Sequence, residues 1–209
     1  MLAPRKTLWS TPDAVVDRVL QWVPLEGDIV CDIGCGDGKV ILQWASTYSQ
    51  VGKQPDDCNT ETLLPSFVGI DIDAVRIQEA EAAVTEARAK GSINPGISIS
   101  FHCANALEAT HLFQGKATVF FLYLIPRGLR KIKPVLLPPQ KQTKVGGKID
   151  SSIQKKEILH QVRVVTYMSP LPDETPDRRE SIPVPHQPGA AWPLYLYTLS
   201  TSTVSDGQS

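Results

Sequence analysis

A glycine-rich turn flanked by carboxylates is the clearest chemical feature of the sequence. The run DIGCGDG (32–38) follows an apolar segment and precedes one with helical apolar spacing. Glycines let the backbone bend tightly and let a ligand approach without meeting a Cβ, and the free N–H groups of the next helix attract electron-rich ligands. A second apolar segment, 67–71, ends in Asp71. A carboxylate at that position can accept hydrogen bonds from both hydroxyls of a ribose.

The order of these glycines and acids favours S-adenosylmethionine over a dinucleotide as the ligand. The dinucleotide pattern is G-x-G-x-x-G, whereas here the third glycine, Gly38, comes one position early. Asp32, two residues before the first glycine, would repel a pyrophosphate but suits a ligand with a cationic end. S-adenosylmethionine carries an ammonium, a carboxylate, a sulfonium and a ribose, and it has no phosphate. A glycine turn that only closes a strand–helix corner is the remaining alternative.

Alternating strand-like and helix-like segments predict that an α/β domain with a parallel sheet positions these residues. The first helix is expected after Thr11, with Thr11 as its N-cap and Pro12 in its first position. Further helices are expected after Gly38, over 73–90 and from Pro126. The expected strands are 29–33, 67–71, 97–101, 117–124, 162–168 and 193–200.

The segments without such patterns predict the domain organisation. The polar segments 46–66 and 138–160 are expected to be inserted loops, and 169–191 is Pro-rich and irregular. We therefore predict a single domain over residues 1–200 and a disordered tail over 201–209.

Composition excludes several classes of protein. The chain has 209 residues, of which 42% are hydrophobic, so it suits one domain with a sizeable core. A net charge of -1 argues against a protein that binds nucleic acid over its whole surface. No segment approaches the roughly 18 apolar residues of a membrane span. The four cysteines have no zinc-site spacing, which predicts reduced thiols and no metal site.

Three segments resemble motifs of the class I (seven-β-strand) S-adenosylmethionine-dependent methyltransferases. They are VCDIGCGDG (30–38), VGIDID (68–73) and FHCANALE (101–108). The resemblance implies a Rossmann-like, doubly wound and mostly parallel sheet of seven strands, with S-adenosylmethionine as the cofactor. The residues that it implies in cofactor binding are Asp32, Gly34, Cys35, Gly36, Asp37, Gly38, Asp71, Ile72, Asn105 and Ala106.

A narrower resemblance concerns the substrate. The Thr-Pro start of the first helix and the run FLYLIPRGLRKIKPVLL (121–137) are similar to the small protein-lysine methyltransferases that act on the adenine nucleotide translocase and the ATP synthase c-subunit. This implies methylation of a protein lysine, with Tyr123 as the catalytic residue and Trp9, Thr11 and Tyr123 as the substrate-binding residues. Each has a structural alternative, since Tyr123 fits a core aromatic, Trp9 a hydrophobic staple and Thr11 a helix cap.

Other functions remain open from the sequence. The segment 127–156 is rich in Lys and Arg with Asp150 as its one acid, which suits RNA or an acidic surface as well as a solvated helix face. The alternatives are therefore a methyltransferase acting on RNA or a small molecule, and an inactive interaction subunit with this fold. Residues 1–6 have no apolar stretch typical of an export signal. A cytoplasmic location is expected, with the mitochondrion as the alternative.

Overall fold

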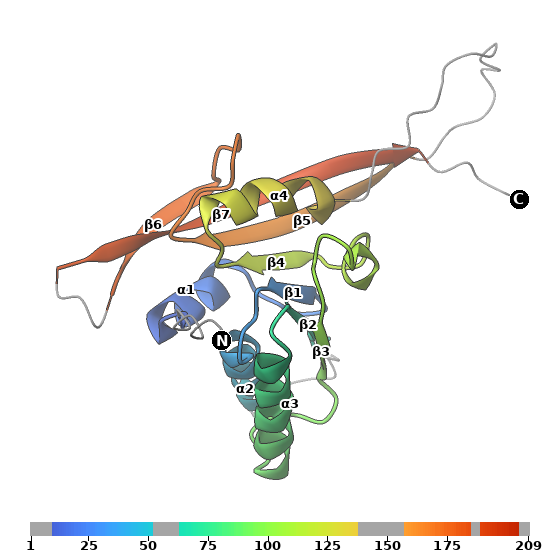
Figure 1. Ribbon diagram of the computed structural model, residues 1–209, viewed down its shortest axis with the longest axis vertical. Coiled ribbons are helices and arrows are strands. Elements are labelled where there is room, and N and C mark those ends of the chain that lie inside the picture. Colours follow the sequence, from blue (N-terminus) through green and yellow to red (C-terminus); the bar gives the residue numbers. More distant parts are fainter. Residues whose placement is uncertain (1–9, 52–62, 138–156, 185–188, 205–209) are drawn as a thin grey trace, which may run out of the picture.

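The computed structural model describes residues 10–51, 63–137, 157–184 and 189–204 (Figure 1). Its strands are β1 (Ile29–Ile33), β2 (Ser66–Asp71), β3 (Ser98–Cys103), β4 (Val119–Leu122), β5 (Glu157–Tyr167), β6 (Arg178–Pro183) and β7 (Ala191–Val204). Its helices are α1 (Asp13–Trp22), α2 (Lys39–Val51), α3 (Ala74–Ala89), α4 (Pro126–Leu136) and the short 3-10 helix η1 (Thr110–Leu112).

The strands form one sheet in the order β3-β2-β1-β4-β5-β7-β6. Strands β1 to β5 pair in parallel, whereas β7 is antiparallel to both β5 and β6. The predicted seven-stranded, mostly parallel sheet is therefore confirmed. The chain runs outward from β1 to β3 and then crosses to β4, so the strand order reverses between β1 and β4. In open α/β sheets, ligands bind at the carboxyl ends of the strands beside such a reversal.

Helices cover both faces of the sheet, because the buried strands alternate between two apolar clusters. Val30 and Phe121 face the first cluster, which includes the buried faces of α1 and α2. Cys31 and Phe120 face the second cluster, which includes the buried face of α4. Figure 1 shows α4 over β5 and β7, away from α1, α2 and α3. This arrangement leaves the carboxyl ends of β1 and β4 between the two helical layers.

Gly69 of β2 has no side chain, and this lets the glycine turn lie close to the sheet. Gly69 pairs with Phe101 of β3, and a Cβ on Gly69 would lie 2.4 Å from the Phe101 ring and 2.9 Å from the Cys35 Sγ. Both distances are shorter than van der Waals contact, and one of the two neighbours belongs to the turn itself. Gly69 therefore sets how closely residue 35 approaches β2.

Gly69→Ala should lower the thermal unfolding midpoint by several degrees, because overpacking of a filled core costs about 1–3 kcal/mol. Phe101→Leu in the same chain should restore part of the loss, since a smaller side chain makes room for the added methyl group. Circular dichroism melts of the wild type, both single variants and the double variant measure this. An unchanged midpoint in Gly69→Ala would contradict the packing argument.

The predicted polar loop 46–66 is wrong at its start, because α2 continues to Val51. The polar side chains of this last stretch bond within the helix: Thr47 Oγ1 donates to the Gln43 carbonyl and Ser49 Oγ to the Ala45 carbonyl. Tyr48 is half-buried, and its hydroxyl accepts the Leu25 N–H. Residues 52–62 of the predicted loop lie outside the described residues.

Strand β6 lies within 169–191, where the sequence predicted irregular structure. Of its residues only Ile182 is buried, so no apolar run marks the strand. Charged residues are typical of edge strands, where they discourage pairing with other chains. Here the Arg18–Glu180 ion pair (3.2 Å) and the Arg178 guanidinium, 4.6 Å from the centre of the Trp22 ring, hold β6 beside α1.

The predicted start of β5 and the predicted end of β7 also differ from the structure. Residues 157–160 of the predicted insertion 138–160 belong to β5, and residues 201–204 of the predicted tail belong to β7. They pair with each other, Glu157 with Val204 and His160 with Thr201. Residues 138–156 and 205–209 lie outside the described residues. In the described part of the chain, no helix is long and apolar enough to cross a membrane.

Candidate functional site

Hydrogen bonds to β2 shape the glycine turn after β1. The Gly34 and Cys35 N–H groups both donate to the Ile70 carbonyl, at 2.7 and 3.2 Å. Gly36 has a φ of 56°, in the left-handed region that favours glycine, and its N–H donates to Asp71 Oδ2 at 2.9 Å. The turn and the carboxylate at the end of β2 are therefore built as one unit.

Asp71 holds both of its oxygens in fixed directions. Oδ2 accepts from Gly36, and Oδ1 accepts the Asp73 N–H at 2.9 Å. Asp73 in turn caps α3 by accepting the N–H groups of Val75 and Arg76. Because a carboxylate has about four acceptor sites, Asp71 keeps lone pairs for two further donors.

Asp32 is an acid buried at the carboxyl end of β1, with 3% of its surface exposed. Burial, and to a smaller extent the nearby Asp71 and Asp37 carboxylates, together raise the pKa of Asp32 to about 8. The pKa of the Cys35 thiol is also well above its usual range, mainly because of burial. Cys35 therefore stays protonated and is not a nucleophile.

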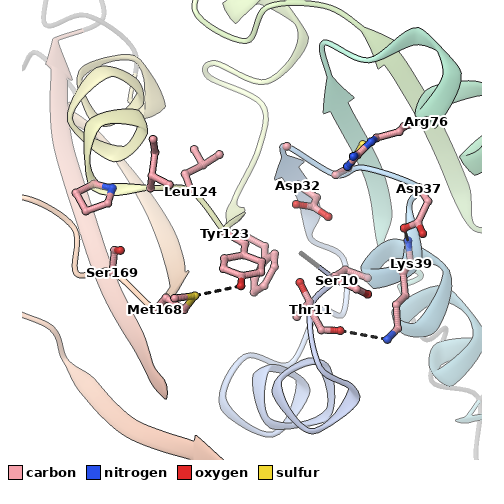
Figure 2. A pocket seen from close by; sticks show the side chains of 16 residues that line it. Ser10, Thr11, Asp32, Asp37, Lys39, Arg76, Tyr123, Leu124, Met168 and Ser169 are labelled. Atoms are coloured by element: carbon pink, nitrogen blue, oxygen red, sulfur yellow. Dashed lines mark hydrogen bonds between the residues drawn. The ribbon is translucent and has the colours of Figure 1, made fainter. Parts of the chain in front are cut away.

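A pocket of about 470 Å³ opens beside Asp32. It is lined by Ser10, Thr11, Asp32, Gly34, Cys35, Asp37, Lys39, Val40, Arg76, Phe121, Tyr123, Leu124, Ile125, Pro126, Met168 and Ser169. Figure 2 shows Asp32, Asp37 and Lys39 across the pocket from Met168 and Ser169, with Tyr123 between them. One wall thus comes from the glycine turn and the start of α2, and the other from the ends of β4 and β5.

Tyr123 follows the last residue of β4 and is half-buried. Its hydroxyl donates to the Met168 Sδ at 3.1 Å, and its ring meets the Tyr167 ring edge-on with centroids 4.9 Å apart. Burial raises the pKa of Tyr123, so the phenol is neutral near pH 7. Tyr123 packs against the first apolar cluster and also lines the pocket, so it fits both the core and the site interpretation.

The segment before α1 closes one side of the pocket. The predicted Thr11 cap is wrong: the N-cap is Pro12, without a side-chain hydrogen bond, and its carbonyl accepts the Val15 N–H. Thr11 instead lies buried at the pocket. Lys39 Nζ donates to the Thr11 carbonyl at 3.2 Å and pairs with Asp13 Oδ1 at 2.7 Å. Trp9 lies outside the described residues.

The residues predicted to hold an adenine follow the ends of β2 and β3 and do not line this pocket. The Ala104 N–H donates to the Asp71 carbonyl at 2.9 Å, which brings the segment after β3 beside β2. Ile72 is 77% exposed, and Ala106 packs into the second apolar cluster. Asn105 Oδ1 accepts the Leu107 N–H at 3.1 Å, and a second lone pair on that oxygen remains for a ligand.

Gly36, Gly38 and Asp71, also predicted to hold the cofactor, do not line this pocket either. A Cβ on Gly38 would lie 2.7 Å from the Phe101 ring, so its lack of a side chain serves packing. Sequence reasoning missed the lining residues Ser10, Lys39, Arg76, Met168 and Ser169. Lys39 directly follows the turn, and Met168 and Ser169 directly follow β5, so proximity to strand ends was the signal available for them.

The described residues contain no group of three or more His, Cys, Asp or Glu that could hold a metal ion. Their cysteines, Cys31, Cys35 and Cys103, are free thiols, and Cys58 lies outside the described residues.

Comparisons with known proteins gave one relative in sequence and many in structure. No family model matches the chain. A protein-lysine N-methyltransferase from Saccharolobus islandicus (strain REY15A) is 28% identical over 142 residues, which cover 68% of this chain and 72% of that protein.

Two solved structures are similar to this one over most of their length. An RNA methyltransferase from Salinibacter ruber, in complex with S-adenosyl-L-homocysteine, has a TM-score of 0.59 at 23% identity, covering 90% of this chain and 92% of the other. Magnesium protoporphyrin IX methyltransferase from Synechocystis PCC 6803, with bound S-adenosylmethionine, has a TM-score of 0.51 at 16% identity, covering 87% and 76%. With its strand order and its antiparallel β7, the chain has the class I S-adenosylmethionine-dependent methyltransferase fold.

Proposed function

We propose that this chain is an S-adenosylmethionine-dependent methyltransferase whose acceptor is a lysine amine of a protein. The observation that carries the proposal is the pocket at the strand reversal, where Asp32 and the glycine turn face Tyr123 and the ends of β4 and β5. The solved structures of this fold that contain S-adenosylmethionine or its demethylated product support the cofactor.

The donor side of the proposed site uses the residues around the turn. We assign the buried Asp32 to the ammonium of the methionine part, and Gly34, Cys35, Gly36, Asp37 and Gly38 to the bend around it. Asp71, whose oxygens are already oriented, would accept hydrogen bonds from the two ribose hydroxyls. Exposed Ile72 would contact the adenine, and Asn105 and Ala106 would lie at its edge. S-adenosylmethionine supplies an electrophilic methyl group on its sulfonium.

The acceptor side must position an amine and keep it neutral. Positioning two reactants can by itself contribute several kcal/mol to lowering the barrier. A free lysine has a pKa near 10.4 and must lose its proton before its nitrogen can attack. Leu124, Ile125, Pro126 and Met168 make the acceptor wall largely apolar, and an apolar wall disfavours the ammonium form. Tyr123 is neutral near pH 7, so it orients the amine and does not take its proton.

The choice of a protein lysine draws on two observations. The archaeal relative, 28% identical, is named a protein-lysine N-methyltransferase. The sequence 121–137, which contains Tyr123, resembles enzymes of that kind.

Incubation with radiolabelled S-adenosylmethionine and a cell lysate tests the proposal directly. A cytoplasmic lysate is the first choice and a mitochondrial lysate the second, following the expected locations. Label should appear in protein bands, resist ribonuclease and be lost with protease, and acid hydrolysis should release methyl-lysine. The Asp71→Ala variant is the inactive control. Wild-type protein that binds the donor but labels nothing would favour the non-enzymatic interaction subunit.

RNA is the second candidate acceptor, because one face of α4 is basic. Arg127, Arg130 and Lys131 are exposed on this helix, which begins at the pocket with Pro126. Basic side chains that follow one surface neutralise phosphates and make binding depend on salt. The same lysate experiment separates the candidates, since label lost with ribonuclease and kept with protease would favour RNA.

A further inference from the structure

Met168 has an unusual backbone conformation at the edge of the pocket. It directly follows β5, and its φ of 68° lies in the left-handed region, where Asp173 is the other non-glycine of the described residues. A methionine gains nothing locally from this conformation, since its Cβ crowds the following carbonyl. Backbone strain of this kind persists only where the surroundings impose it, and it is most often found at functional sites.

Two hydrogen bonds hold Met168 in this conformation. The Met168 N–H donates to the Pro193 carbonyl of β7 at 2.8 Å, and the hydroxyl of fully buried Thr166 donates to the Ser169 carbonyl at 2.7 Å. The turn after β5 is thus held on both sides of Met168. As a result the side chain points into the pocket beside Tyr123 (Figure 2).

The contact between these two side chains has a definite direction. The Tyr123 hydroxyl donates to the Met168 Sδ at 3.1 Å, and a thioether has no proton to give back. The hydroxyl proton therefore points at the sulfur, and the remaining lone pairs of the oxygen point elsewhere. The edge-on Tyr167 ring, with centroids 4.9 Å apart, packs against the same phenol and restricts its rotation.

We propose that Met168 is a positioning residue for the acceptor, because it makes the Tyr123 oxygen an acceptor-only group for an N–H of the incoming amine. The inference rests on the proposed function and adds how the acceptor amine is oriented in the pocket. A neutral amine has two N–H bonds and one lone pair. When one N–H is held by Tyr123, the direction of the lone pair toward the donor is restricted. In the transfer, that lone pair forms the N–C bond, the C–S bond breaks with its electrons on sulfur, and the new ammonium loses a proton to water.

Met168→Leu keeps the size and apolarity of the side chain and removes the hydrogen-bond acceptor. We expect the maximal rate of methyl transfer to fall roughly 10-fold, a barrier change of about 1.4 kcal/mol, with unchanged affinity for S-adenosylhomocysteine. The probe is the ribonuclease-treated protein fraction of a lysate, and initial rates at several concentrations give the maximal rate and the half-saturating concentration. Calorimetry with S-adenosylhomocysteine gives the affinity. Met168→Gln, which restores an acceptor oxygen at similar length, should recover part of the rate.

A double-mutant cycle separates positioning from simple packing. Tyr123→Phe removes the hydroxyl, so Met168→Leu should cost nothing further in that background. Equal rate losses in both backgrounds, or a wild-type rate in Met168→Leu, would overturn the role of Met168 and leave the proposed function intact. Wild-type protein that labels no protein at all would overturn both.

Discussion

Asp71→Ala should weaken the binding of S-adenosylhomocysteine about 100-fold or more, and methyl transfer should be lost with it. In the proposed site this carboxylate accepts two ribose hydroxyls, and each hydrogen bond to a charged group contributes about 1.5–3 kcal/mol. The same change frees the Gly36 N–H, whose bond to Asp71 helps to hold the turn. Isothermal titration calorimetry measures the affinity.

The matched control is Asp73→Ala, two residues along the chain. Asp73 caps α3, so its loss should cost roughly 1 kcal/mol of stability and leave the affinity near that of the wild type. Undiminished binding by Asp71→Ala would contradict the assignment of the ribose site. A similar loss of affinity in both variants would indicate general disorder of the turn.

Binding of S-adenosylmethionine should release a proton from Asp32. With a pKa of about 8 in the free protein, this carboxyl carries its proton in about 0.9 of molecules at pH 7. A ligand ammonium beside it favours the ionised form, so the proton leaves as the ligand binds. Affinity should therefore rise with pH from 6 to 8, by up to about tenfold per pH unit, and level off above 8.

Calorimetry in buffers of different ionisation enthalpy counts the released protons at pH 7. Asp32→Asn cannot ionise, so it should bind weakly and show no buffer dependence. Equal binding enthalpies for the wild type in all buffers would contradict the role of Asp32.

In the ligand-free protein, the same carboxyl of Asp32 should lower stability as the pH rises. The pKa of Asp32 is about 8 in the fold against 3.8 for an unperturbed carboxyl, so between these values the folded state binds the extra proton. The contribution of Asp32 to the free energy of unfolding thus falls as pH rises from 4 to 8, by roughly 1.4 kcal/mol per unit. Asp32→Asn should gain stability over the wild type at pH 8 and gain little at pH 4. Thermal melts of both proteins at the two pH values measure the difference.

The contact between the glycine turn and Asp71 could be predicted from the sequence, because both lie at strand ends. The turn follows β1 and Asp71 ends β2, and parallel neighbours bring such ends together. The acceptor side depends on distant contacts. The φ of Met168 is set by pairing with Pro193, and Thr11 reaches the pocket because Lys39 holds the segment before α1. No spacing in the sequence records these contacts.

Strand β6 was not predicted from the sequence for a different reason. Periodicity reveals a strand through its buried side, and β6 buries only Ile182. Its identity as a strand comes from backbone pairing with β7 and from the Arg178 and Glu180 contacts with α1. Polar edge strands of this kind become visible only when the neighbouring strand is known.

The two walls of the pocket come from different halves of the sheet. Residues beside the turn belong to the half that contains β1, β2 and β3, whereas Tyr123 and Met168 belong to the half that contains β4 and β5. Substitutions in the β4–β5 half can therefore change which acceptor fits the pocket without changing the residues of the other half. If the two walls bind the methyl donor and the acceptor as proposed, evolution can change the acceptor while the donor site stays the same.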